Sequence, residues 1–178
     1  MMGIVLVGLA EFVQRKKGKE AVTEVFKGSG VNPSSIMEQM IYPEETFMVL
    51  FKKASEVTGI EPHEFQIEWG RFMSKMMNDK FPVFSESSGT AIELLEKVPE
   101  IHFKVFPTIV GKQTQKIYIK ESGKNYIVIN YESPNGLCTF MKAMIDEVVK
   151  KYDEQASIVE TRCVRKNDLS CEIKVLFH

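Results

Sequence analysis

The spacing of hydrophobic residues changes at about Pro107, and this change constrains the fold of the 178-residue chain more than any other feature. Before that point apolar residues recur at helical spacing, as in Phe65, Trp69 and Met73. After it, apolar and polar residues alternate in Lys116–Lys120, as they do in a strand with one buried face. The sequence therefore predicts an α+β chain, with helices first and paired strands after them.

Six helices are expected in the first part. They are Gly3–Lys17, Lys19–Phe26, a helix opened by Pro43 that ends near Gly59, one that starts at Glu61–Pro62, one capped by Thr90 that runs through Leu94 and Leu95, and one opened by Pro99 that holds His102 and Phe106. Proline suits the first turn of a helix because the N–H that it lacks would have no intrahelical partner there.

A β-β-α-β-β pattern is expected in the second part. Its elements are the strands Lys116–Lys120, Tyr126–Tyr131, Ser157–Val164 and Ser170–Phe177, and the helix Gly136–Lys151. Ser122–Gly123 is typical of the turn in the first hairpin. We expect one domain over residues 1–178, with a helical N-terminal subdomain (1–60) packed on a C-terminal subdomain (61–178) that holds a four-stranded antiparallel sheet.

Charge and motif content exclude several functional classes. Lys and Arg number 23 and Asp and Glu 24, so the net charge of -1 provides no general attraction for nucleic acid or an anionic membrane. The longest apolar run, Met1–Ala10, is too short to be a transmembrane segment, and its flanking charges follow it, unlike those of a signal peptide. We expect a cytoplasmic protein with reduced thiols. Phosphate-loop, dinucleotide-binding, hydrolase-elbow and zinc-protease motifs are absent from the sequence, so an enzyme is not expected.

One histidine and one turn are candidates for a binding role. His102 has the apolar neighbours Val98 and Ile101, and it is either a hydrogen-bonded core residue or a ligand of a metal or haem. The segment from Tyr131 to Gly136 lies between a strand and a helix. It is either an ordinary turn or a site where the phenol of Tyr131 and the hydroxyl of Ser133 donate to a carboxylate or phosphate.

The three cysteines are Cys138, Cys163 and Cys171. Cys163 and Cys171 are expected close together on adjacent strands. They are either small buried hydrophobic residues or part of a zinc site, in which Glu160 is a candidate fourth ligand.

Taken together, these segments resemble the H-NOX family of haem-based nitric oxide and oxygen sensing domains, which is related to the regulatory haem domain of soluble guanylate cyclase. The resemblance covers nearly the whole chain. It is carried by the order and spacing of Met2–Val5, Leu9–Val13, Tyr42–Glu44, Phe81–Pro82, Pro99–His102 and Tyr131–Pro134.

The resemblance implies a bound haem b. His102 matches the proximal ligand of the haem iron, and Tyr131 and Ser133 match the first two residues of the Tyr-x-Ser-x-Arg motif that holds the propionates. The motif arginine is replaced by Asn135, which lacks a fixed charge. Arg71 and Lys112 are candidates to supply that charge.

The resemblance also implies a ligand and a partner. Val5, Leu9 and Phe140 match the distal pocket, and Phe140 stands where oxygen-binding members carry a tyrosine. An apolar pocket predicts a sensor that binds nitric oxide or carbon monoxide and excludes oxygen. A separate signalling protein, such as a histidine kinase, a cyclic-dinucleotide enzyme or a chemotaxis receptor, would read the sensor. The alternative is a divergent member that has lost haem and binds another ligand or acts as an interaction module.

The resemblance also strengthens the zinc hypothesis. Some bacterial members hold structural zinc with three cysteines and a histidine. Cys138, Cys163 and Cys171 fall at matching positions, and Glu160 stands in the place of the histidine.

Overall fold

The structure, a computed structural model, describes residues 1–105, 116–132 and 135–178, apart from the side chains of 103–105 and 116. Its elements follow one another in the order α1 (Gly3–Lys17), α2 (Lys19–Phe26), η1 (Pro33–Ser35), α3 (Glu44–Thr58), α4 (Pro62–Lys80), α5 (Pro82–Glu86), α6 (Ala91–Val105), β1 (Lys116–Gly123), β2 (Tyr126–Glu132), α7 (Cys138–Lys151), β3 (Ala156–Arg162), η2 (Val164–Lys166) and β4 (Cys171–Phe177). The predicted α+β class is confirmed.

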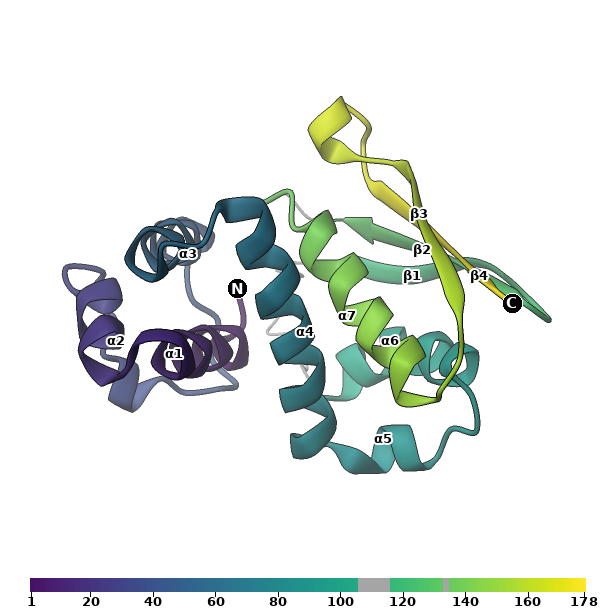
Figure 1. The fold of residues 1–178 in the computed structure, drawn as a ribbon, viewed down its shortest axis with the longest axis horizontal. Helices are drawn as coiled ribbons and strands as arrows, with labels where there is room; N and C mark the ends of the chain where they lie inside the picture. The colour runs from purple at the N-terminus through teal and green to yellow at the C-terminus, as the bar shows by residue number, and fades with distance from the viewer. Residues whose placement is uncertain (106–115, 133–134) are drawn as a thin grey trace.

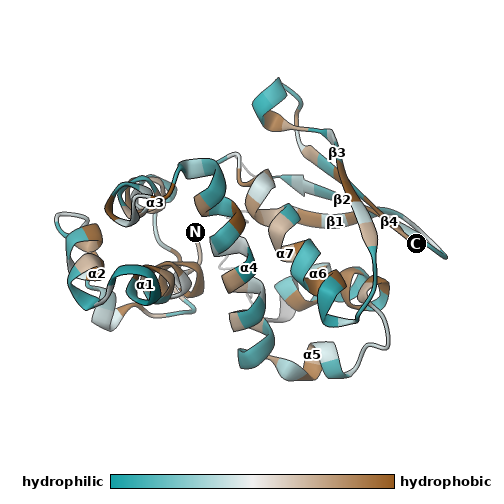
Figure 2. Cartoon of the chain, viewed as in Figure 1, coloured by the Kyte–Doolittle hydropathy of each residue, from teal (hydrophilic) through white to brown (hydrophobic). Residues whose placement is uncertain are grey.

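Helix α4 lies between the N-terminal helices and the rest of the chain (Figure 1). Its residues Phe65, Trp69, Met73 and Met76 are buried at helical spacing. Each helix carries both hydrophobic and hydrophilic residues along its length (Figure 2). The apolar faces of α1, α3 and α4 therefore meet in one core, while α4 also packs closely along α7.

The prediction of two separate helices around Pro99 is wrong. The structure has one helix over Ala91–Val105, with Pro99 inside it. Thr90 caps this helix as expected, since its Oγ1 accepts from the N–H of Glu93 at 3.3 Å. An interior proline removes one helical hydrogen bond. The buried residues Ala91, Leu94 and Leu95, and the contacts of α6 with α7 and the sheet, offset that loss.

The four strands form one antiparallel sheet in the order β1-β2-β4-β3. Gly123 pairs with Tyr126, so the first hairpin turns at Lys124–Asn125, and the predicted turn at Ser122–Gly123 is wrong by two residues. Helix α6 contacts β1 and β2, and α7 contacts β3. Helix α7, which packs on α4 and also contacts α6, thus connects the sheet to α4.

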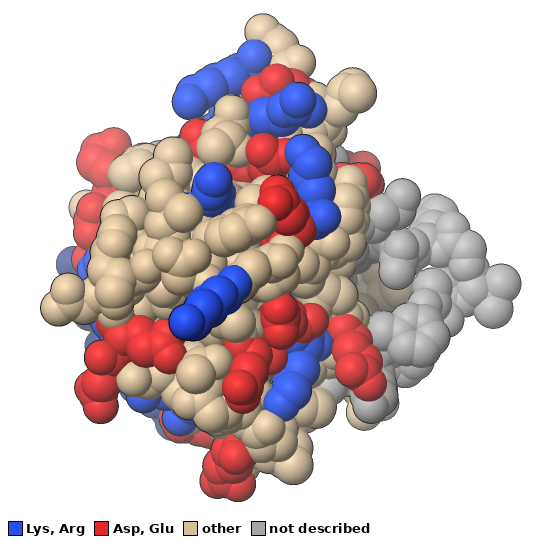
Figure 3. Space-filling model, turned by 90° about the vertical axis from the view of Figure 1, so that its right-hand side faces the viewer, with Lys and Arg blue, Asp and Glu red and all other residues tan. Residues whose placement is uncertain are grey.

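The surface of the protein carries mixed charge. Lys and Arg side chains lie among Asp and Glu side chains on the face that Figure 3 presents, and neither sign forms a large patch there. Within the part of the chain that the structure describes, every helix is too short or too polar to cross a membrane.

Candidate functional site

His102 lies on α6, and its imidazole is neutral at pH 7. Burial lowers the pKa of His102 to about 4, although the side chain keeps some accessible surface. The other histidines differ: His63 is exposed in the first turn of α4, and the His178 Nε2 lies 2.8 Å from the Ser157 Oγ. A neutral imidazole has a lone pair to offer a metal, so His102 is in the protonation state that ligation requires.

The residues predicted to line a distal pocket come from α1 and α7. Leu9 is fully buried, Phe140 is buried, and Val5 is partly buried. Helices α7 and α4 approach closely at Phe140, because a Cβ atom added to Gly70 would lie only 2.6 Å from the carbonyl oxygen of Phe140. The backbone N–H of Phe140 donates to the Gln66 Oε1 at 3.3 Å.

Trp69 lies beside Phe140, one of the residues predicted to line the distal pocket. The sequence indicated Trp69 only as a core residue. Its ring centroid lies 4.4 Å from that of Phe140, and its side chain is fully buried. The indole Nε1 has no hydrogen-bond partner among the described residues. The sequence shows that such a donor is present, because a buried tryptophan always brings an N–H donor into the core.

The Tyr131–Asn135 segment is only partly described. Tyr131 is buried on β2, where it pairs with Ile117 of β1 and Cys171 of β4, and Ser133 lies outside the described residues. Asn135 is half-buried and donates its Nδ2–H to the Glu44 Oε2 at the start of α3.

Of the two candidates for a compensating charge, the structure describes only Arg71. The guanidinium of Arg71 is 3.6 Å from Asp146 and 3.9 Å from Glu147, both on α7. Lys112 lies outside the described residues. The partner of Asn135 is a carboxylate, Glu44, which also accepts from the amino group of Met1 at 2.9 Å.

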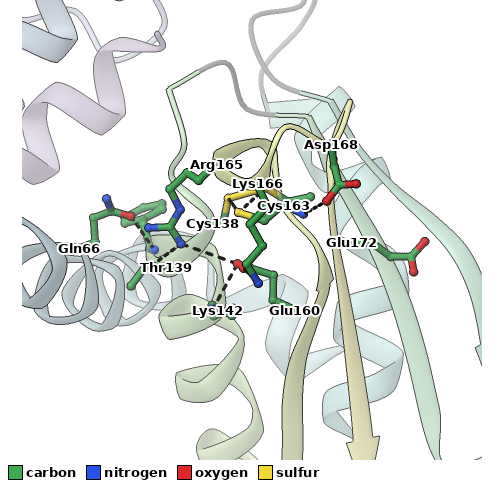
Figure 4. The surroundings of a disulfide bond; sticks show 12 residues. Gln66, Cys138, Thr139, Lys142, Glu160, Cys163, Arg165, Lys166, Asp168 and Glu172 are labelled. Atoms are coloured by element: carbon green, nitrogen blue, oxygen red, sulfur yellow. Dashed lines mark hydrogen bonds and ion pairs between the residues drawn. A yellow bond between two sulfur atoms is a disulfide. The ribbon is translucent and has the colours of Figure 1, made fainter.

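The three cysteines lie together where α7 begins beside the ends of β3 and β4, and Cys163, which was expected within a strand, lies directly after β3. The structure joins Cys138 and Cys171 in a disulfide, and Cys163 is free and buried (Figure 4). The Cys163 Sγ lies 3.5 Å from that of Cys138 and 3.9 Å from that of Cys171. The disulfide departs from the expectation of three reduced thiols.

Glu160 lies beside this cluster among cationic side chains. Its carboxylate is 3.4 Å from the Lys142 Nζ, 3.8 Å from the Arg165 guanidinium and 3.7 Å from the Lys166 Nζ (Figure 4). Burial raises the pKa of Glu160, but Lys142, a hydrogen bond with Cys163, and Arg165 together hold it below its usual value. Among the described residues, the potential metal ligands that lie within 4.8 Å of one another here are the three cysteine sulfurs.

A family model described as haem-NO-binding matches residues 2–160. The chain belongs to the haem-NO-binding family. Solved structures of H-NOX proteins share its fold. A protein from S. oneidensis in the Fe(II)NO ligation state gives a TM-score of 0.85 at 13% identity, covering 100% of this chain and 99% of that one. An oxygen-binding H-NOX domain related to soluble guanylate cyclases gives 0.84 at 20% identity, covering 99% and 95%.

A third H-NOX structure, an Fe(II) unliganded protein from K. algicida, gives a TM-score of 0.82 at 16% identity, covering 100% of this chain and 97% of that one. A search of curated protein sequences found no match. The solved structures support the fold of this haem-NO-binding chain, and at these identities they do not by themselves transfer a ligand.

The residues of this haem-NO-binding domain fit a haem group. The axial candidate His102 is held neutral by burial. Apolar side chains from α1 and α7 are available to cover a porphyrin, and the buried indole N–H of Trp69 lacks an acceptor among the described residues. The weaker part of the fit is Asn135, whose amide group is already bonded to Glu44.

Proposed function

We propose that this protein is a haem-based sensor of nitric oxide, with carbon monoxide as a second ligand. Ferrous haem, when bound, would supply the iron at which the gas binds. The observation that carries the proposal is His102, a largely buried and neutral imidazole on a helix that contacts both α7 and the sheet. Membership of a haem-binding family supports the same conclusion and favours a sensor domain over an enzyme.

The direct test is a haem titration followed by the fluorescence of Trp69. The chain has one tryptophan, so its emission reports on a single position. Haem bound beside Phe140 would quench this emission at one equivalent. Unchanged emission and no bound haem would refute the proposal and favour the haem-free alternative, in which the fold serves another ligand or a protein partner.

Tyr131, Ser133 and Asn135 would hold the propionates. Asn135 can offer only neutral donors, and Glu44 places a carboxylate close to where an anionic group would bind. Charge repulsion from Glu44 and the missing guanidinium both weaken retention of haem.

Asn135→Arg should therefore strengthen haem binding. A guanidinium can bond to Glu44 and to a propionate together, and one charge-assisted hydrogen bond contributes about 1.5–3 kcal/mol, or about 10- to 100-fold in affinity. The rate of haem transfer to apomyoglobin measures the change. Asn135→Gln, which adds length without charge, is the matched control. Equal transfer rates for wild type and Asn135→Arg would contradict this role for position 135.

We propose that the pocket formed by Val5, Leu9 and Phe140 disfavours oxygen. Bound oxygen carries partial negative charge and is stabilised by a hydrogen-bond donor, which the phenyl ring of Phe140 does not provide. Phe140→Tyr should therefore create measurable oxygen affinity in the ferrous protein, detected as a stable spectrum in air. Phe140→Leu is the control, since it changes the volume without adding a donor. A tyrosine variant without oxygen affinity would show that position 140 does not face the gas.

Signalling would pass through α6. This helix carries His102 and contacts α7, β1 and β2, so a change at His102 can reach the sheet through direct packing. We propose a separate partner, such as a histidine kinase, a cyclic-dinucleotide enzyme or a chemotaxis receptor, as the reader of that change.

We also propose that the reduced form of the cysteine cluster holds structural zinc. Cys138, Cys163 and Cys171 are close enough for three thiolates to share one ion. Glu160 lies outside this group, and it would have to exchange its cationic neighbours for the ion to become the fourth ligand. Protein purified with reductant and without chelator should contain about one zinc per chain by elemental analysis. Cys163→Ser should lower this content. Zinc-free protein with three titratable thiols would contradict the zinc proposal.

A further inference from the structure

Asn135 already has a carboxylate partner inside the chain. Its Nδ2–H donates to the Glu44 Oε2, and the other oxygen of the same carboxylate, Oε1, accepts from the amino group of Met1 at 2.9 Å. Both oxygens of Glu44 therefore accept a hydrogen bond, although the side chain keeps 26% of its surface exposed. A haem propionate is also a carboxylate, so Glu44 offers Asn135 the same chemical group that haem would bring.

The backbone holds Glu44 in this place. Glu44 is the first residue of α3, where the unpaired N–H groups of a helix favour an acidic side chain. The chain just before it is paired with the N-terminal segment, since the Tyr42 N–H donates to the Met1 carbonyl at 2.8 Å and the Tyr42 carbonyl accepts from the Met1 amino group at 2.7 Å. The contact of Glu44 with Asn135 is thus preorganised in the haem-free protein.

A haem carboxylate would meet this contact when it arrives. The amide of Asn135 has two N–H donors, and Glu44 uses one of them. A propionate at the second donor would lie beside the Glu44 carboxylate, and two carboxylates on one neutral amide repel each other. The arginine that Asn135 replaces would provide more donors and a positive charge between the two anions.

We propose that Glu44 takes the place of a propionate in the haem-free protein and competes there with the haem carboxylates. The inference rests on the proposed haem function and goes beyond charge repulsion, because Glu44 must give up its bond to Asn135 when haem binds. Haem loading is then coupled to release of the start of α3. The contact also determines selectivity, since a porphyrin without ionised carboxylates does not compete with Glu44.

The test compares one variant with two ligands. Glu44→Gln keeps the size of the side chain and removes its charge. It should raise the affinity for haem about ten-fold, as expected for one charge-assisted hydrogen bond, measured by Soret absorption in a titration of the reduced apo-protein. The affinity for haem dimethyl ester, in which both propionates are esterified, should stay unchanged. The same variant should lower the urea midpoint of the apo-protein, because the amino group of Met1 loses its ion pair.

Glu45→Gln is the matched control. Glu45 lies in the same first turn of α3 and its side chain is exposed, so this substitution removes the same charge from the same helix end. It should leave the affinities for both ligands unchanged. The Asn135→Arg background gives a second comparison. A guanidinium can hold Glu44 and a propionate together, so Glu44→Gln should no longer strengthen haem binding in that background.

Two results would overturn the inference, and they differ in what else they refute. If Glu44→Gln leaves haem affinity unchanged, or shifts the affinities for haem and its dimethyl ester equally, Glu44 has a structural role only and the proposed haem function stands. If neither the wild type nor Glu44→Gln takes up haem, the proposed function is refuted and this inference with it.

Discussion

His102→Ala should lower haem affinity by at least about 100-fold, since even residues that only support a metal ligand contribute 10- to 100-fold. The variant removes the one imidazole that burial keeps neutral on α6. Titration of haem into the reduced apo-protein, followed by its Soret absorption, measures the change. Imidazole added to the buffer should restore part of the binding, because it can replace the missing ring. A variant that had merely unfolded would not respond.

His63→Ala is the matched control for this experiment. His63 is exposed in the first turn of α4, so its removal should leave haem affinity unchanged. Equal haem binding by wild type and His102→Ala would show that His102 is a core residue and not the ligand.

The second large effect concerns the haem-free protein at mildly acidic pH. The pKa of His102 is about 4 in the folded state and 6.5 in the unfolded chain. Between these values the unfolded chain binds a proton that the folded protein does not, so the free energy of unfolding decreases as pH falls. The slope approaches about 1.4 kcal/mol per pH unit, and the total loss is about 3 kcal/mol.

Urea denaturation of the apo-protein at pH 7 and pH 4.5 tests this expectation. His102→Leu keeps an apolar group of similar size and should remove most of the pH dependence in this range. The pKa values of Glu160 and Glu172 are lowered from 4.5, so their contributions are lost mainly below about pH 4.5, and they are the same in the wild type and the leucine variant. Identical pH slopes for the wild type and the leucine variant would show that the imidazole is not held neutral.

Local signals were enough to predict most element boundaries. Gly18 separates α1 from α2 with φ of 86°, and Gly59 ends α3 in a left-handed conformation. Pro62 begins α4 at a position where proline is favoured. These features act within a few residues of chain, so the sequence carries them directly.

The prediction was wrong where long-range packing overrode a local rule. Pro99 would end most helices, but α6 continues through it because its apolar face packs on α7 and the sheet. The turn of the first hairpin is set by the pairing of Gly123 with Tyr126, and Gly123 itself remains in the strand.

Residue type suggested the candidate site residues more readily than their partners. His102, Phe140 and the three cysteines could be named as candidates from the sequence, and their roles stay predictions. The bond between Asn135 and Glu44 joins residues 91 positions apart, and no local pattern reports it. The unpaired state of the Trp69 N–H likewise depends on what surrounds the ring, and only the structure describes those surroundings.

The central claim is most directly tested by the absorption spectrum of the purified, reduced protein, recorded before and after addition of haem and then nitric oxide. We predict a Soret band that appears at one equivalent of haem, shifts with nitric oxide, and is lost in His102→Ala. A protein that retains no haem once the unbound haem has been removed would contradict the claim, and the fold would then serve a different ligand.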